Sequence, residues 1–269
     1  VKRKFFEGLP NFSENKTQVI YHSIDPVTKN TKKNKQIIFV GKLNESKGYD
    51  LFCKALFPIL DKHTDWKAIS IGDEKRFQHY NTHKKHINLG QISHKKVLNF
   101  LSKSAIAVIP SRWEEPFGRT ALEATSMGCA TIISSNGGLT ETTDHAIILK
   151  KLNSKNLELE INKLINNKNL RKNLQLKSQK NVKHKLFENS HKIDKMRGSL
   201  FPFSNFNTNN GKLRILNIYN MAQKLNHRIY NLSLGKKFTN GFIRNGHDVI
   251  EISDRDYVRQ NKAFNLLSF

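Results

Sequence analysis

The chain has 269 residues, of which 37% are hydrophobic, so it is long enough for one large domain or two modest ones with a buried core. Its 46 lysine and arginine residues against 22 acidic residues give a formal net charge of +24, which by itself favours a nucleic acid or an anionic membrane surface as partner. The positive residues are mostly lysines scattered along the whole chain rather than gathered beside stacking aromatic residues, and this distribution argues against a nucleic-acid reader.

Cysteine usage and hydropathy narrow the class of protein further. Cys53 and Cys129 lie in apolar segments without a paired framework, so we expect both to be reduced core residues. No run approaches the roughly 20 apolar residues needed to span a bilayer. We therefore expect a cytoplasmic protein that is soluble or peripheral to an anionic membrane. Because the chain begins at Val1 rather than Met, we expect it to be part of a longer polypeptide.

Hydrophobic periodicity predicts strands and helices in alternation. Residues 18–24 form a predicted short strand, and residues 36–40 form an apolar strand of the kind that parallel sheets bury on both faces. From Lys47 onward the spacing of apolar residues predicts an amphipathic helix with a kink at Pro58. Further strands are predicted at 66–71, 87–89, 105–109, 130–134 and 146–149, and further helices at 93–102, with Ser93 as N-cap, and before Met127. The alternation predicts an α/β fold with a doubly wound parallel sheet.

The segment Glu115-Pro-Phe-Gly-Arg-Thr-Ala-Leu-Glu123 places two carboxylates around the start of a predicted helix. Pro116 and Gly118 permit a tight turn into that helix, and the exposed amides of a helix N-terminus bind anions. A diphosphate can rest at this terminus while the carboxylates accept hydrogen bonds from sugar hydroxyls. The pattern predicts a sugar-nucleotide site; the alternative for an isolated glutamate pair is a loop with two solvated carboxylates.

Other charged residues are predicted to lie at the same edge of the sheet, because the carboxyl ends of parallel strands meet there. Lys42 and Lys47 follow the strand at 36–40, Asp73 follows the next strand, and residues 112–118 follow the strand at 105–109. The two lysines can neutralise a nucleoside diphosphate, which is also the leaving group whose charge grows in the transition state.

In order and spacing, several segments resemble the C-terminal domain of family 4 glycosyltransferases, which have the GT-B fold. They are Ser111-Arg-Trp-Glu-Glu-Pro-Phe-Gly118, Leu122-Glu-Ala124, Met127-Gly-Cys-Ala-Thr-Ile-Ile-Ser134 and Gly137-Gly-Leu-Thr-Glu141. Upstream, Ile37-Ile-Phe-Val-Gly-Lys-Leu-Asn-Glu-Ser-Lys-Gly48 resembles the first strand and phosphate-contacting loop of that domain, and Ser70-Ile-Gly-Asp73 resembles the end of its next strand. The resemblance covers about residues 18 to 195 and implies the Rossmann-like, donor-binding half of a GT-B enzyme.

The resemblance implies a role for each matching residue. Glu123 would hold the nucleotide ribose, Glu115 would contact hydroxyls of the donated sugar, and Lys42 and Lys47 would clamp the diphosphate. Glu115, Lys42 and Lys47 are the implied catalytic residues. The other implied donor-binding residues are Gly41, Asp73, Ile92, Arg112, Phe117, Gly118, Arg119, Gly137 and Gly138. The family usually has Arg where this chain has Lys42, so a point charge replaces a bidentate fork.

The resemblance also implies a retaining hexosyltransferase that needs no metal and no cofactor beyond its co-substrate, a UDP- or GDP-linked sugar. The matched region has no Asp-x-Asp triplet and no His and Cys residues at metal-ligand spacing, which agrees with that expectation. The implied acceptor is a cell-surface glycan or a lipid-linked molecule. Two alternatives remain open: a catalytically silent nucleotide-sugar-binding module and, from composition alone, a basic nucleic-acid-binding protein.

Domain boundaries follow from the same resemblance. Residues 1–25 would be the end of an N-terminal acceptor domain and the hinge, with His22-Ser23 where the family often has Asn-Gly. Residues 26–198 would be the donor-binding domain, whose last part, 155–197, shows basic helical patterns. The rest of the acceptor domain, which would supply the other wall of the cleft, is expected elsewhere in the full-length polypeptide.

Beyond a predicted linker at 199–212, residues 213–269 show the pattern of a second unit. Its predicted elements are a strand at 213–219, a helix at 236–244, a turn at Asn245-Gly246-His247 and a strand at 248–252. This order resembles the first βαβ unit of the N-terminal Rossmann domain of another glycosyltransferase, and about 55 residues are too few to complete such a domain. We therefore expect two glycosyltransferase modules in tandem, with a compact rearranged protein as the alternative.

Overall fold

The computed structural model describes residues 19–25, 31–74, 83–200, 212–219 and 234–253. The chain divides into two compact units, Val1–Leu200 and Phe201–Phe269.

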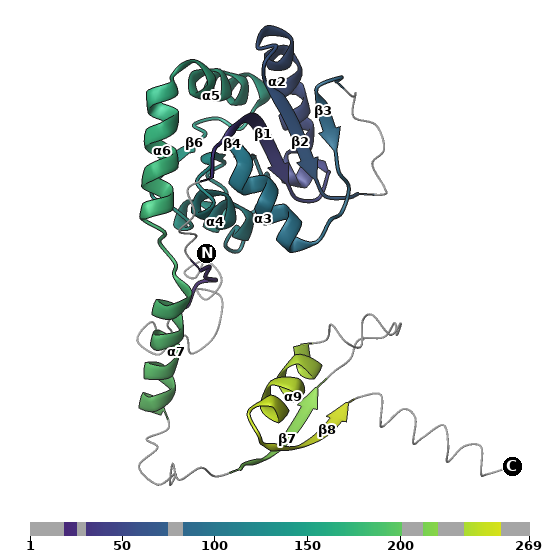
Figure 1. The fold of residues 1–269 in the computed structure, drawn as a ribbon, viewed down its shortest axis with the longest axis vertical. Coiled ribbons are helices and arrows are strands. Elements are labelled where there is room, and N and C mark those ends of the chain that lie inside the picture. Colours follow the sequence, from purple (N-terminus) through teal and green to yellow (C-terminus); the bar gives the residue numbers. More distant parts are fainter. Residues whose placement is uncertain (1–18, 26–30, 75–82, 201–211, 220–233, 254–269) are drawn as a thin grey trace, which may run out of the picture. The chain divides into compact units, whose positions relative to one another are not determined.

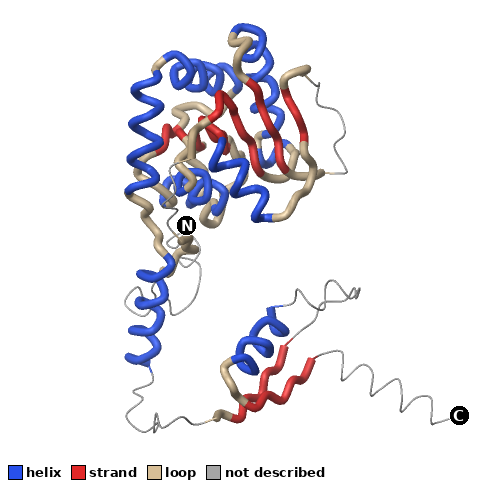
Figure 2. The backbone as a smooth tube through the Cα atoms, viewed as in Figure 1, coloured by secondary structure: helices blue, strands red, loops and turns tan. Residues whose placement is uncertain are grey.

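Within its described residues, the first unit contains a parallel sheet of six strands (Figure 2). The strands are β1 (Asn34–Val40), β2 (Lys67–Ile71), β3 (His86–Asn88), β4 (Ser104–Ile109), β5 (Ala130–Ile133) and β6 (Ala146–Ile148). Their spatial order is β3-β2-β1-β4-β5-β6, the order of dinucleotide-binding sheets, so the predicted doubly wound parallel sheet is confirmed. Isoleucine, valine and alanine fill the central strands because both faces of a parallel sheet are buried.

Helices cover both faces of this sheet (Figure 1). On one face, α2 (Tyr49–Lys62) and α5 (Ser154–Asn166) pack on Ile37 and Phe39 of β1; on the other, α3 (His94–Lys103) and α4 (Arg119–Ser126) pack on Ile38. Successive strand residues point to opposite faces, so one apolar run supplies both cores. The unit ends with α6 (Lys168–Lys180) and α7 (Leu186–Leu200).

Two local predictions need correction or refinement. The predicted strand at 18–24 is wrong for its described part, since residues 19–25 form a single bridge, between Ile24 and Lys185, rather than a strand. No strand lies beside the described part of this segment. Hydrogen bonds instead join it to residues that precede and begin α7, namely His184, Leu186 and Asn189. The second prediction concerns Pro58, where the sequence predicts a kink. Pro58 lies inside α2, and the helix continues past it to Lys62.

The second unit contains the predicted βαβ arrangement. Strands β7 (Arg214–Tyr219) and β8 (Asp248–Ser253) pair in parallel, and α9 (Leu234–Arg244) connects to β8 through a turn at Gly246. Asn217 on β7 donates its amide to the carbonyl of Gly235 and to the hydroxyl of Thr239 on α9. Three elements are thus held together by side chains as well as by strand pairing.

The two described strands of this unit leave one sheet face uncovered. Leu216, Ile218 and Ile250 are 57%, 68% and 67% exposed on that face, which lies opposite the face that Asn217 directs at α9. A two-stranded sheet with an exposed apolar face is marginal by itself in water. Among the described residues of the whole chain, we find no helix with the length and apolarity that a membrane span requires.

Candidate functional site

The carboxyl ends of the parallel strands lie at one edge of the sheet, and the loops that follow them carry the expected donor-site residues (Figure 1). Lys42 follows β1, Asp73 follows β2, and Glu115 lies in the loop after β4. The direction of winding reverses between β1 and β4. Doubly wound sheets bind ligands at such a reversal, which here lies between the loop after β1 and the loop after β4.

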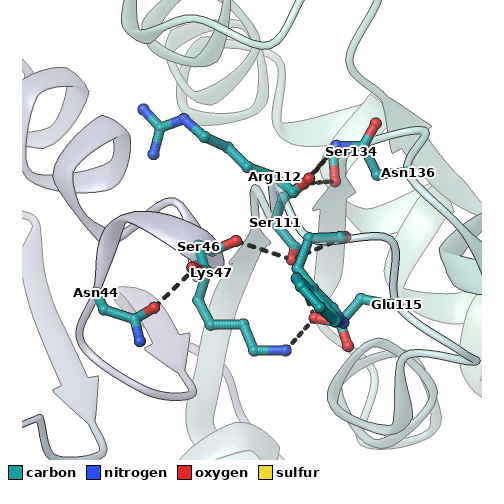
Figure 3. A network of polar contacts seen from close by, with 9 residues as sticks. Asn44, Ser46, Lys47, Ser111, Arg112, Glu115, Ser134 and Asn136 are labelled. Carbon is teal, nitrogen blue, oxygen red and sulfur yellow. Dashed lines mark hydrogen bonds and ion pairs between the residues drawn. The ribbon is translucent and has the colours of Figure 1, made fainter.

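Lys47 and Glu115 meet between these two loops (Figure 3). Lys47 ends a short 3-10 helix, η2 (Glu45–Lys47), and the side chain of its N-cap Asn44 accepts a hydrogen bond from the Lys47 backbone N–H at 3.1 Å. The Lys47 Nζ donates to Glu115 Oε1 at 2.5 Å, and the two side chains are only 29% and 15% exposed. The contact joins a cation suited to phosphate with a carboxylate suited to sugar hydroxyls.

A buried serine supports Glu115 from behind (Figure 3). The Ser111 hydroxyl donates to Glu115 Oε1 at 3.0 Å, and Ser111 is completely buried. The Ser134 hydroxyl and the Asn136 amide in turn donate to the Ser111 carbonyl at 2.7 and 3.0 Å. Because buried polar groups need partners, this network fixes the direction of the Glu115 carboxylate.

The side chain of Arg112 is held by the protein on the side away from Glu115 (Figure 3). Its guanidinium donates to both carboxylate oxygens of Asp50 on α2, at 2.5 and 2.7 Å. Burial disfavours the charged form of Asp50, but the hydrogen bonds and charge of Arg112 outweigh it, so the Asp50 pKa lies below its ordinary value. Arg112 thus ties the loop after β4 to α2, and its guanidinium is already paired at the expected donor site.

Two glycines allow the loop after β4 to turn into α4. Gly118 has φ 94° at the N-cap of α4, and Gly137 has φ 61° opposite Glu115, where a Cβ would lie 2.3 Å from the Glu115 carbonyl oxygen. The Gly138 N–H donates to that same oxygen at 2.6 Å. A side chain at Gly137 would push the glycine turn away from Glu115, so the expected proximity of these segments has a steric basis.

Glu123 lies on α4 with one carboxylate oxygen already bound. Its Oε1 accepts from Arg119 Nε and from His94 Nε2, each at 2.9 Å, and the Glu123 side chain is only 8% exposed. Arg119 lies one turn before Glu123 on α4, whereas His94 is the first residue of α3. The carboxylate expected to bind ribose is therefore oriented from two helices.

The remaining expected residues differ in accessibility. Lys42 and Asp73 are exposed, and Gly41 connects β1 to Lys42. Ile92, expected near the nucleotide base, is half-buried against the core between α3 and the sheet. Phe117 is buried, and its ring contacts Tyr21 and His184 with centroid separations of 5.4 and 5.3 Å. The Phe117 ring therefore packs between the segment 19–25 and the residues that precede α7.

The segment 19–25 is held by polar contacts as well. The Tyr21 hydroxyl donates to Glu141 Oε2 at 2.5 Å, and the Asn189 amide on α7 donates to the Tyr21 carbonyl at 2.9 Å. The hydrogen bond to Glu141, together with burial, raises the pKa of Tyr21 to about 12. Tyr21 is thus bound both to Glu141, at the end of the glycine turn, and to Asn189 on α7.

Both cysteines are buried and free, as expected for reduced core residues. Burial raises the pKa of the Cys53 thiol to about 12 and that of Cys129 to about 11, so neither is a reactive thiolate at neutral pH. In the part of the chain that the structure describes, no three His, Cys, Asp or Glu residues are grouped as a metal site would need.

The family model described as "Glycosyl transferases group 1" matches residues 22–181, a range that contains Lys47 and both glutamates. The chain belongs to the group 1 glycosyl transferases. The parallel sheet flanked by helices agrees with the GT-B fold of solved glycosyltransferase structures.

Curated relatives of this glycosyl transferase match part of their own length. An uncharacterized glycosyltransferase of Methanocaldococcus jannaschii is 31% identical over 160 residues, which are 51% of this chain and 41% of that protein. The 2-deoxystreptamine N-acetyl-D-glucosaminyltransferase of Niallia circulans is 29% identical over 158 residues, 55% of this chain and 40% of that protein. The chain spans half or less of the length of the curated relatives it matches.

Solved structures share the fold of this glycosyl transferase. Anabaena HepE in complex with UDP and glucose superposes with a TM-score of 0.61 at 18% identity, over 70% of this chain and 58% of that one. The C-terminal domain of a group 1 family glycosyl transferase from Francisella tularensis superposes with a TM-score of 0.53 at 23% identity, over 60% of this chain and 96% of that one. At these identities the likeness establishes fold alone.

Sequence reasoning missed three groups that the structure brings to the site. Ser111 and Asn136 brace Glu115, and His94 contacts Glu123. Ser111 begins the matched motif, and that position could have indicated a role. His94 directly follows the predicted N-cap Ser93, but sequence spacing gives no sign that α3 and α4 are neighbours at this point.

Proposed function

We propose that the first unit is the donor-binding half of a retaining, metal-independent family 4 glycosyltransferase of the hexosyltransferase type. It would use a UDP- or GDP-linked sugar and transfer the sugar to a cell-surface glycan or a lipid-linked acceptor. The observation that carries the proposal is the contact of Lys47 with Glu115 at the winding reversal, with Glu123 on the adjoining helix. That arrangement offers a cation, a sugar-binding carboxylate and a ribose-binding carboxylate along one edge.

Each group has a chemical task in this proposal. Lys47 and the exposed Lys42 neutralise the diphosphate, whose charge grows as the glycosidic bond to phosphate breaks. Glu115, braced by Ser111, accepts hydrogen bonds from hydroxyls of the donated sugar. Glu123 accepts hydrogen bonds from the ribose. Backbone N–H groups at the start of α4, which follows Gly118, face the same negative charge.

The proposal also covers the donor nucleotide, the cellular location and the acceptor domain. Anabaena HepE is solved with UDP and with UDP-glucose, and this supports a uridine nucleotide as the first donor to test. We propose a cytoplasmic location with peripheral contact to an anionic membrane, where lipid-linked acceptors lie; the net charge of +24 supports that contact. The acceptor domain is proposed to belong to the full-length polypeptide, and residues 213–269 to a second glycosyltransferase module.

Binding without transfer is the second candidate function. Transfer requires donor and acceptor to be held together away from water, which supplies about 7 to 11 kcal/mol of barrier reduction. The described first unit presents one wall of such a cleft, and the chain spans half or less of its curated relatives. A nucleotide-sugar-binding module is therefore consistent with the same geometry.

Calorimetric titration of the 269-residue chain with UDP, GDP, ADP and their glucose conjugates tests the proposal. We expect one nucleoside diphosphate to bind, and Glu123→Gln to weaken it by about 1.5 to 3 kcal/mol through loss of a charged hydrogen-bond acceptor. Glu158→Gln, a half-buried glutamate on α5, is the control and should leave affinity unchanged. Equal affinity of wild type and Glu123→Gln would remove the ribose assignment.

The basic nucleic-acid-binding alternative predicts a different outcome in the same preparation. DNA or RNA affinity would fall steeply with salt concentration and would be indifferent to Glu115. If no nucleoside diphosphate binds and nucleic-acid affinity shows such a salt dependence, the glycosyltransferase proposal is refuted and the nucleic-acid-binding alternative is supported.

A further inference from the structure

His94 contributes the most specific contact that the proposed roles leave unexplained. Its Nε2 lies 2.9 Å from Glu123 Oε1, and its side chain is 54% exposed at the start of α3. A carboxylate oxygen can only accept, so Nε2 carries a proton in this contact, in the neutral Nε2–H tautomer or in the imidazolium. The hydrogen bond needs only the proton on Nε2, which both of these forms carry.

The two donors to Glu123 leave its other oxygen open. Arg119 Nε and His94 Nε2 both donate to Oε1, and Oε2 accepts no hydrogen bond from a described residue. No buried side-chain nitrogen or oxygen of the described residues lacks a partner, so Oε2 is in contact with solvent. A carboxylate pinned at one oxygen from two helices cannot rotate freely, and its second oxygen points in a fixed direction.

We propose that His94 is a positioning residue for nucleotide recognition. It holds Oε1 of Glu123 so that Oε2 is presented to a ribose hydroxyl, and it thereby sets the preference of the site for ribonucleotides over 2′-deoxyribonucleotides. The inference rests on the proposed function, in which Glu123 binds ribose. Because the carboxylate is oriented before the ligand arrives, binding needs little further ordering of that side chain.

Arg119 alone is a weaker constraint than the pair. It lies four residues before Glu123 on the same helix, and its side chain is 64% exposed. An exposed helix pair of this kind contributes little by itself. His94 donates to the same oxygen from α3, so a second helix anchors the carboxylate. Removal of His94 is therefore expected to disturb the orientation of Oε2 even with Arg119 in place.

The test compares UDP with 2′-deoxy-UDP, or GDP with 2′-deoxy-GDP if the chain prefers guanine. We expect wild type to favour the ribonucleotide by about tenfold or more, the factor for one hydrogen bond to a charged group. His94→Ala should reduce this preference by about threefold to tenfold, with little change in affinity for the deoxynucleotide. His94→Gln keeps an N–H donor and should restore most of the preference.

A matched control separates positioning from general loosening of the fold. His63, at the C-cap of α2, makes one comparable contact, 2.8 Å from its Nε2 to Asn162 Oδ1 on α5. His63→Ala should leave the ribose preference at its wild-type value. Loss of affinity for both nucleotides in equal proportion in His94→Ala, or an unchanged preference, would overturn the inference.

The failures of the two proposals are distinguishable. If no nucleoside diphosphate binds to wild type, the proposed function fails. If UDP or GDP binds with no preference over its deoxy form, the site stands, but Glu123 does not read the ribose 2′-hydroxyl and the role of His94 is refuted.

Discussion

Replacement of Lys47 by alanine tests the charge arrangement of the site most directly. Lys47 is paired with Glu115 at 2.5 Å, so a diphosphate must compete with this carboxylate for the ammonium group. Two unit charges about 4 Å apart attract by about 4 kcal/mol at the effective dielectric of a protein surface. The side chains are 29% and 15% exposed, so solvent screens part of that attraction.

The expected effect depends on how many phosphates the ligand carries. One charge-assisted hydrogen bond is worth about 1.5 to 3 kcal/mol, so Lys47→Ala should weaken UDP binding by about 10- to 150-fold. Uridine has no phosphate, and its affinity should stay within about twofold of wild type because the base and ribose contacts do not involve Lys47. UMP should show an intermediate loss if only its single phosphate reaches the lysine.

Isothermal titration calorimetry with uridine, UMP and UDP measures these losses. If the chain prefers guanine, guanosine, GMP and GDP are used instead. Lys54→Ala, at an exposed position on α2, removes one positive charge elsewhere and is the control for net charge. If Lys47→Ala weakens uridine and UDP by the same factor, or if Lys54→Ala matches its effect on UDP, the clamp does not include Lys47 and the reasoning from this pair is refuted.

Three further predictions follow from other parts of the structure. Lys42→Arg should leave UDP affinity unchanged or tighten it, since a fork replaces a point charge; a calorimetric loss of affinity would contradict a phosphate contact at this position. Leu56→Ala, in the core between α2 and the sheet, should lower the free energy of unfolding in urea by about 2 to 5 kcal/mol, while the control Leu159→Ala, 65% exposed, should change it by less than about 0.5 kcal/mol. Burial and the nearby charge of His83 lower the pKa of His86 from 6.5 to about 4, so the unfolded state binds the proton first and stability is lost as pH falls from about 6.5 to 4, by at most about 3 kcal/mol. His86→Gln, which cannot titrate, should flatten this slope in urea titrations between pH 7 and 5, and an unchanged slope would assign the acid sensitivity to other groups.

The local sequence pattern was sufficient to predict the sheet, because each strand is a short apolar run bounded by polar or turn-forming residues. The run Ile37-Ile-Phe-Val40 is buried over most of its length, and it could be assigned to a parallel sheet without knowledge of its neighbours. The segment at 18–24 looks similar by composition, but no strand lies beside its described residues. Strand formation depends on a partner, and one chain segment does not reveal whether that partner exists.

The site was predictable as a set of positions and less so as a set of contacts. Motif spacing placed Lys47, Glu115 and Glu123 along one edge, as the structure has them. It gave no indication that Arg112 would bind Asp50 on α2, because that bond joins residues 62 positions apart. The bond between His94 and Glu123 depends likewise on the packing of α3 beside α4, which only tertiary structure determines.

The charged groups of the candidate site lie largely in pairs, and this explains how several ionised groups can lie close together. Lys47 is balanced by Glu115, Arg119 by Glu123 and Arg112 by Asp50. Lys42 is exposed, and within the described residues no ion pair involves it, so a diphosphate would meet that charge first. Lys47 can then exchange its bond to Glu115 for a phosphate oxygen, and the exchange frees Glu115 Oε1 at the moment the sugar arrives. Ser111 still holds that oxygen from behind, so the carboxylate keeps its direction while its partner changes. Under the proposed function, the step that neutralises the diphosphate therefore also makes Glu115 available to accept hydrogen bonds from the sugar hydroxyls.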